Sequence, residues 1–401
     1  MYITGLLTLM GCISDYEPDI VNQIGGLLVV DGFITNDTTR IRLSHSVRML
    51  DEFEEGESIT DANVFVESDK GAVFETLNVS KDGVYTIPMG ELNPAYKYRL
   101  SINWNNKEYK SEYLNPLDTP VIDSISVESS ASETPVYICV TTHDNKVEPT
   151  YYKWTYQEIW EFHVDLFANA GFLDDKFTLF QKHTSKNTYY CWGRDSSKAM
   201  LLESTNKLTV NLIYKRKLIE IPRDHDKLTM LYYIDVKQNR IRKEAYDYFV
   251  NLQRNIEQAG SIFSPIPSER RGNISCVSDP KEWVIGYVDV TNTTIMKRFM
   301  PELRDFYETS YDCAKNILTG IAPDGYTYYI YSGSPTTPNI YAPFRCVDCT
   351  HDGRGTKNKP SWWPTDHYCL GLGIKDIYSI KIYRWLFRSG FMENTYICKN
   401  V

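Results

Sequence analysis

The chain has 401 residues, 42% hydrophobic and 24% charged, which are ordinary globular values that exclude a disordered chain, a collagen-like repeat and a polytopic membrane protein. This length favours at least two domains. The 43 Lys and Arg against 52 Asp and Glu give a net charge of −9 with no basic cluster to offset it, so we do not expect a nucleic-acid partner.

The N-terminus predicts a lipid anchor. Residues 1–11 are mostly apolar but too few for a membrane-spanning helix, which needs about 20 residues. The sequence Leu9-Met10-Gly11-Cys12 resembles the lipobox of bacterial lipoproteins, although Met10 is larger than usual and no Lys or Arg precedes Cys12. We expect residues 1–12 to be a lipoprotein signal with a lipidated Cys12, and residues 13–25, which begin with a polar, acidic stretch over residues 13–19, to be a tether. The alternative is a buried cysteine ending an apolar strand.

Residues 26–114 predict an immunoglobulin-like β-sandwich. Short segments alternate apolar and polar residues, as where Ile41 and Leu43 lie between charged side chains, and turn residues separate these segments. The acidic residues 51–57 indicate a solvated loop, with a cation site as the less favoured alternative. Two tripeptides, Asp37-Thr38-Thr39 and Asp123-Ser124-Ile125, resemble an O-glycosylation motif of exported Bacteroidetes proteins, so Thr38 and Ser124 are candidate acceptors.

Residues 115–134, with Pro116 and Pro120, predict a linker to a larger β-rich domain over residues 135–401. Residues 151–162 predict a long strand with an almost wholly aromatic face, interrupted by Glu158, which we interpret as a core face rather than an exposed binding surface. A further strand is predicted at residues 207–213. Apolar residues every three or four positions predict one amphipathic helix over residues 240–259, ended by Gly260. The expected fold is therefore mainly β.

The nine cysteines separate into one anchor and eight candidates for disulfides, because an even number outside the cytoplasm can pair. The pairing is not readable from the sequence. Zinc ligation by Cys346, Cys349, His367 and Cys369, with His351 nearby, or free thiols are the alternatives. The eight candidates are Cys139, Cys191, Cys276, Cys313, Cys346, Cys349, Cys369 and Cys398.

Trp362 and Trp363 follow a Gly- and Lys-rich segment that reads as a loop held by such bridges. Adjacent strand residues point to opposite faces, so we expect one ring to pack inside and the other to contact a ligand or partner. No hydrolase, P-loop or dinucleotide motif is present in the sequence, and Glu158 and Glu161, three apart on a strand, would point to opposite faces. We therefore expect no catalytic residues, no metal and no cofactor.

Phrases along the chain together resemble a family of Bacteroidetes lipoproteins catalogued as domain of unknown function 4249. They include Leu28-Val-Val-Asp-Gly-Phe-Ile34, Asp118-Thr-Pro-Val-Ile-Asp-Ser124, Tyr151-Tyr-Lys-Trp154, Glu244-Ala-Tyr-Asp-Tyr248, Val284-Ile-Gly-Tyr287 and Cys346-Val-Asp-Cys349. The resemblance implies an outer-membrane lipoprotein often encoded beside a TonB-dependent transporter, with no assigned catalytic residues.

The leading hypothesis is a non-catalytic lipoprotein, anchored in the outer membrane and facing the cell exterior. It would bind an unknown ligand or a polypeptide as the accessory subunit of a TonB-dependent β-barrel transporter. The alternatives are an adhesin or envelope-structural protein, and a zinc-dependent enzyme that uses Cys346, Cys349, His367 and Cys369.

Overall fold

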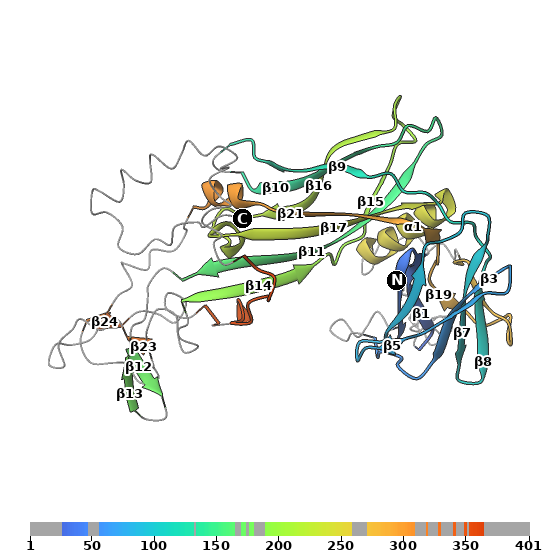
Figure 1. The fold of residues 1–401 in the computed structure, drawn as a ribbon, viewed down its shortest axis with the longest axis horizontal. Helices are drawn as coiled ribbons and strands as arrows, with labels where there is room; N and C mark the ends of the chain where they lie inside the picture. The colour runs from blue at the N-terminus through green and yellow to red at the C-terminus, as the bar shows by residue number, and fades with distance from the viewer. Residues whose placement is uncertain are drawn as a thin grey trace, which may run out of the picture. The chain divides into compact units, whose positions relative to one another are not determined.

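The computed structural model describes residues 26–46, 56–131, 134–164, 170–173, 176–179, 189–258, 271–308, 318–319, 328–329, 340–341, 349–350 and 353–364. The chain divides into two compact units (Figure 1). The first unit comprises Met1–Asp118 and Arg240–Asn292, and the second comprises Thr119–Asn239 and Thr293–Val401. Among the described residues, none of the helices has the length and apolar character needed to cross a membrane.

The first unit is a sandwich of two mainly antiparallel sheets, as the alternating pattern predicts. One sheet has the order β19-β1-β2-β6-β5, with β20 also paired to β1, and the other has the order β18-β8-β7-β3-β4. The strands are β1 (Leu28–Thr35), β2 (Asp37–His45), β3 (Asn63–Ser68), β4 (Val73–Glu75), β5 (Asn78–Val79), β6 (Val84–Gly90), β7 (Tyr98–Trp104), β8 (Lys107–Ser111), β18 (Ile274–Cys276), β19 (Val284–Ile285) and β20 (Val290–Thr291).

Alternation along β2 shows why these segments form strands around a core. Ile41 and Leu43 are fully buried, whereas Arg40 and Arg42 between them are exposed. Side chains from both sheets, among them Val66, Tyr85 and Leu100, form one hydrophobic cluster with Ile41 and Leu43. The acidic residues 51–55 of the expected loop lie outside the described residues.

The predicted helix is α1 (Lys243–Gln258), but its assignment to the second domain is wrong, because residues 240–292 belong to the first unit. Phe249 of α1 makes an edge contact with Phe33 of β1, with ring centroids 5.9 Å apart. After the helix, β18 pairs with β8, and β19 and β20 pair with β1. The chain thus returns to complete both sheets of the first unit.

A buried ion pair fixes the residues just before α1. The Asp289 carboxylate accepts hydrogen bonds from the backbone N–H of Arg242 at 2.8 Å and from the Arg242 guanidinium. Asp289 is completely buried, and burial raises its pKa despite the opposing effect of Arg242.

The second unit is also built from sheets. A five-stranded sheet has the order β14-β11-β17-β21, with β15 also on β11, and a three-stranded sheet has the order β16-β10-β9. Its elements are β9 (Ile122–Glu128), β10 (Val136–His143), β11 (Tyr151–His163), β12 (Ala170–Leu173), β13 (Lys176–Leu179), β14 (Tyr190–Ser196), β15 (Leu201–Ser204), β16 (Leu212–Ile221), η1 (Asp226–Leu228), β17 (Tyr232–Ile241), β21 (Thr293–Phe299), η2 (Pro301–Phe306), β22 (Leu318–Thr319), β23 (Tyr328–Tyr329) and β24 (Ile340–Tyr341).

The aromatic face of β11 is part of this core, as predicted. Tyr152, Trp154 and Phe162 are at most 1% exposed and share one cluster with residues of β10 and β17. Gln238 joins the two sheets, because its side chain accepts from Trp154 Nε1 at 2.8 Å and donates to Thr142 Oγ1 at 3.1 Å. Figure 1 shows β10 and β16 as a layer above β17 and β11.

Candidate functional site

Of the adjacent tryptophans Trp362 and Trp363, one is buried and the other exposed, as the sequence predicts, while a contact with a ligand or partner stays a prediction. Trp363 is 2% exposed and Trp362 is 53% exposed. We expected the two rings to point apart because they lie on a strand, but the backbone here forms a turn instead. The turn is closed by a hydrogen bond of 3.0 Å from the Trp363 N–H to the Pro360 carbonyl. One ring therefore packs inside while its neighbour presents a large apolar surface to solvent.

Trp362 rests on other rings. Its centroid lies 4.8 Å from that of Tyr233 and 6.3 Å from that of Phe299, and Trp363 packs edge-on against Phe299 at 5.5 Å. We call Tyr233, Phe299, Trp362 and Trp363 the ring platform. Such tilted and edge contacts are the favoured geometry of aromatic pairs.

Polar contacts hold the platform against the sheet. Trp363 Nε1 donates to the buried Glu161 carboxylate at 2.9 Å. Earlier in the same segment, Thr356 and Trp192 of β14 exchange two backbone hydrogen bonds, of 2.8 and 2.9 Å. The segment that carries Trp362 is therefore attached to both β11 and β14.

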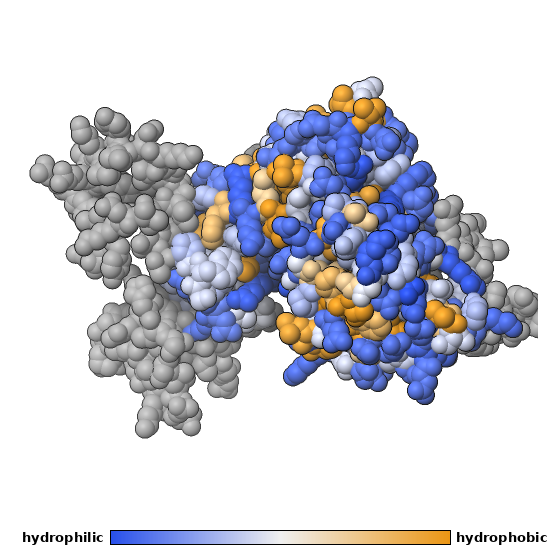
Figure 2. Space-filling view, turned by 45° about the vertical axis from the view of Figure 1, so that its right-hand side comes forward, coloured by the Kyte–Doolittle hydropathy of each residue, from blue (hydrophilic) through white to orange (hydrophobic). Residues whose placement is uncertain are grey.

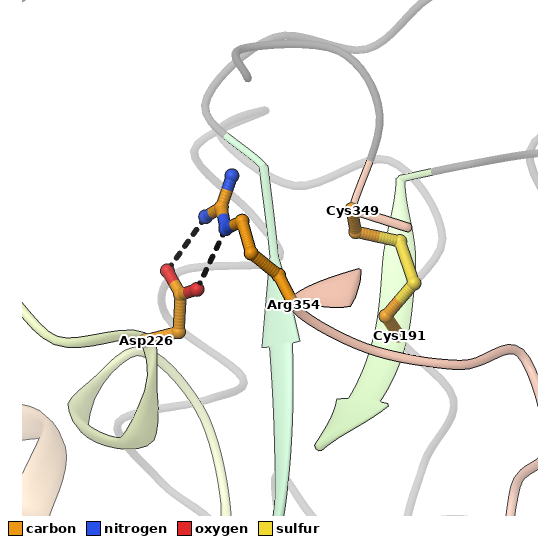
Figure 3. Close-up of a disulfide and its surroundings, with 4 residues drawn as sticks. All are labelled: Cys191, Asp226, Cys349 and Arg354. Atoms are coloured by element: carbon orange, nitrogen blue, oxygen red, sulfur yellow. Dashed lines mark hydrogen bonds and ion pairs between the residues drawn. A yellow bond between two sulfur atoms is a disulfide. The ribbon is translucent and has the colours of Figure 1, made fainter. Parts of the chain in front are cut away.

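A disulfide and an ion pair fix the start of this segment, as Figure 3 shows. Cys191 of β14 is bonded to Cys349, 158 residues later in the chain. The Arg354 guanidinium binds the Asp226 carboxylate through two hydrogen bonds, of 2.9 and 2.7 Å. A bidentate pair of this kind restrains the orientation of the arginine as well as its position.

The remaining cysteine predictions have mixed outcomes. Cys139 and Cys276 are free, buried thiols, so the expectation of bridges is wrong for these two; each lies on a strand with its side chain in a hydrophobic core. The anchor Cys12 and the candidates Cys313, Cys346, Cys369 and Cys398 lie outside the described residues, as do His351 and His367.

The disulfide also bears on the zinc alternative. Cys349 is bonded to Cys191, so its sulfur is not available as a thiolate ligand of zinc. Within the described ranges, no group of three or more His, Cys, Asp or Glu side chains is arranged to hold a metal ion.

Sequence reasoning missed a cluster of polar groups in the core around Glu158. This side chain is 1% exposed, and its carboxylate accepts from Lys227 Nζ at 2.6 Å and from the Tyr232 hydroxyl. The Lys227 ammonium also lies 4.8 Å from the Trp160 ring centroid. The one signal in the sequence was the carboxylate that interrupts the aromatic face of β11.

The burial and charge of this cluster change the pKa values of several side chains. Burial, followed by the Glu158 charge, raises the pKa of Tyr232 well above its usual value and that of Tyr156 to about 12. Burial and the Lys227 charge lower the pKa of His225, whose Nδ1 accepts from the Lys227 backbone N–H at 3.1 Å. Glu158 and Glu161 have separate hydrogen-bond partners, Lys227 and Trp363, as expected for side chains on opposite faces of a strand.

The two glycosylation candidates are accessible. Ser124 is exposed on β9, and Thr38 is half-buried at the start of β2 with an exposed hydroxyl. Modification of either residue stays a prediction.

The second unit also exposes an apolar loop tip. The predicted strand at residues 207–213 is wrong, because β16 begins at Leu212 and the preceding residues form a loop. Val147 is 98%, Val210 62% and Leu208 51% exposed, and Asn211 Nδ2 ties the two loops together by donating to the carbonyls of Lys146 and Glu148. Figure 1 shows these loops at the top of the unit, where Figure 2 shows hydrophobic surface.

Comparison with curated proteins finds no match to the chain. A family model described as Domain of unknown function (DUF4249) matches residues 13–296, which cover most of the chain, including both segments of the first unit and β9–β17 of the second. Three residues of the ring platform, Phe299, Trp362 and Trp363, lie beyond the matched residues. On this match, the chain belongs to the DUF4249 family.

Proposed function

We propose that the protein is a non-catalytic, cell-surface lipoprotein of the outer membrane that binds a polypeptide partner, as the accessory subunit of a TonB-dependent β-barrel transporter. The observation that carries the proposal is the exposed ring of Trp362 on its fixed ring platform. We assign this ring to the contact with the transporter.

The platform has the properties of a protein-binding anchor. Tryptophan is enriched among the residues that contribute most to binding free energy, and a ring already held in place loses little conformational entropy on association. The hydrogen bond from Trp363 to Glu161 and the disulfide at Cys349 supply that restraint before any partner arrives.

Two further observations favour binding over catalysis. The exposed aliphatic side chains of the loop tip, Val147, Leu208 and Val210, form the kind of surface that marks interaction sites. The charged groups around Glu158 are enclosed and paired with one another, so they act on the stability of the core rather than on a substrate.

The anchoring part of the proposal rests on the lipobox-like sequence before Cys12 and on the acidic tether after it. Replacement of Cys12 by Ala removes the acceptor of the lipid. The variant is expected to leave the outer-membrane fraction and appear in the soluble fraction. Full retention of Cys12→Ala in the outer membrane would contradict the lipid anchor.

The transporter role is tested by extracting native membranes with a mild detergent and purifying the full-length protein through an affinity tag. We expect a β-barrel protein to co-purify in a defined ratio. Recovery of the protein without a barrel, but bound to cell-wall or host polymers, would contradict this role and favour the adhesin alternative.

A further inference from the structure

The second unit contains a cavity of about 200 Å³ that the features described above do not use. It lies where β11 ends and β14 begins, and residues of η2 complete its lining. The lining includes His163, Tyr189, Tyr190, Leu231 and Arg304. All of these residues belong to the second unit, so the cavity is a property of that unit alone.

One wall of the cavity is a set of packed rings. His163 and Tyr189 are stacked with centroids 5.1 Å apart and an interplanar angle of 11°. Tyr190 of β14 lies opposite His163 of β11 in the sheet, and its ring contacts that of Tyr189 edge-on with centroids 4.7 Å apart. The His163 ring is oriented by a 2.8 Å hydrogen bond between its Nδ1 and the Val164 carbonyl. A flat ring entering the cavity would therefore meet a preformed aromatic wall.

Arg304 supplies a positive charge to the same cavity. Its neighbours are neutralised within the protein, since Arg298 pairs with Glu302 and Arg223 pairs with Glu308. Among the described residues, by contrast, the half-buried Arg304 guanidinium has no ion-pair or side-chain hydrogen-bond partner. A guanidinium is suited to bind a carboxylate through two parallel hydrogen bonds.

The volume limits the size of the ligand. An apolar cavity of about 150 Å³ is enough to bind benzene, and drug-sized ligands occupy about 300 Å³ or more. A cavity of about 200 Å³ therefore matches one ring with a small substituent.

We infer that this cavity binds a small aromatic carboxylate, with its ring against His163 and Tyr189 and its carboxylate on Arg304. The inference goes beyond the proposed function, which concerns a polypeptide partner and the ring platform rather than this cavity. Its test needs purified protein without a barrel, so the ligand site and the transporter role can fail separately.

The test is a calorimetric titration of the full-length protein with benzoate, benzyl alcohol and acetate as probes. We expect benzoate to bind with a dissociation constant of about 1 mM or tighter and both other probes at least about tenfold more weakly, because each lacks the charge or the ring. Arg304→Gln is expected to weaken benzoate binding about 10- to 100-fold, as loss of a charge-assisted hydrogen bond predicts.

Lys297→Gln is the matched control, since it removes the same charge from an exposed position on β21 outside the cavity lining. It is expected to bind benzoate like the wild type. Absence of benzoate binding, equal binding of acetate and benzoate, or unchanged affinity in Arg304→Gln would each overturn the inference.

Discussion

The buried pair of Glu158 and Lys227 makes a strong prediction for stability. Glu158→Gln keeps the shape of the side chain and an oxygen that accepts from Tyr232, but it removes the negative charge 2.6 Å from the Lys227 ammonium. Lys227 is 11% exposed over its side chain, so water solvates the remaining charge poorly. Leaving one partner of a buried pair uncompensated costs about 3–5 kcal/mol, and we expect the second unit to lose that much stability.

The double variant Glu158→Gln with Lys227→Met separates charge from packing. Methionine is an unbranched apolar side chain of similar length, and it removes the unpaired ammonium together with its contact with the Trp160 ring. Replacement of a buried ion pair by neutral side chains is often tolerated, so we expect the free energy of unfolding of the double variant to fall by only about 1–2 kcal/mol. This loss is smaller than the loss expected for Glu158→Gln alone. Urea unfolding followed by tryptophan fluorescence measures each free energy.

The control is Glu220→Gln, which removes a carboxylate from an exposed position on β16 and is expected to change stability by less than about 0.5 kcal/mol. The reasoning is refuted if Glu158→Gln loses no more stability than Glu220→Gln. It is also refuted if the loss in the double variant equals the sum of the losses in Glu158→Gln and in Lys227→Met, each measured as a single variant, because additivity means that the two charges do not interact.

Two other predictions concern the segment before Trp362 and the start of η1. Cys191→Ser breaks the disulfide to Cys349 and is expected to lower the free energy of unfolding by about 2–5 kcal/mol, measured without reductant; no loss relative to the wild type would show that the bridge is absent or without effect. The lowered pKa of His225 means that the unfolded chain takes up its proton first, near pH 6.5, so stability falls as the pH drops below that value towards the folded pKa. His225→Gln is expected to make the free energy of unfolding depend less on pH between about pH 7 and pH 5. An unchanged slope of this free energy against pH would contradict the assignment of the effect to His225.

Local patterns made much of the fold predictable. Alternation around Ile41 and Leu43 identified β2, and the aromatic parity of residues 151–162 identified β11 and its buried face. Apolar residues at every third or fourth position identified α1, and of these Ala245 and Phe249 are buried, whereas Ile256 is 61% exposed. These features depend on neighbours within one element, so one sequence contains the information.

Long-range pairings were not predictable in the same way. Arg354 meets Asp226 across 128 residues, and Lys227 meets Glu158 across 69, with no local pattern to connect them. The predicted boundary at residues 115–134 contains the first break, after Asp118. The strand β18 completes a sheet beside β8 only after an intervening β-rich unit, and no local pattern indicated that residues 240–292 return to the first unit. Of the eight cysteine candidates, composition alone could not select the pair Cys191 and Cys349.

The contact between Trp362 and a transporter is tested most directly by comparing Trp362→Ala with the wild type in the detergent co-purification. Loss of a central tryptophan typically costs about 2 kcal/mol or more of binding, so we expect barrel recovery to fall at least about tenfold. Leu77→Ala removes an apolar side chain that is 72% exposed in the first unit and is expected to recover the barrel like the wild type. Equal barrel recovery by Trp362→Ala and the wild type would contradict the assignment of Trp362 to the partner contact.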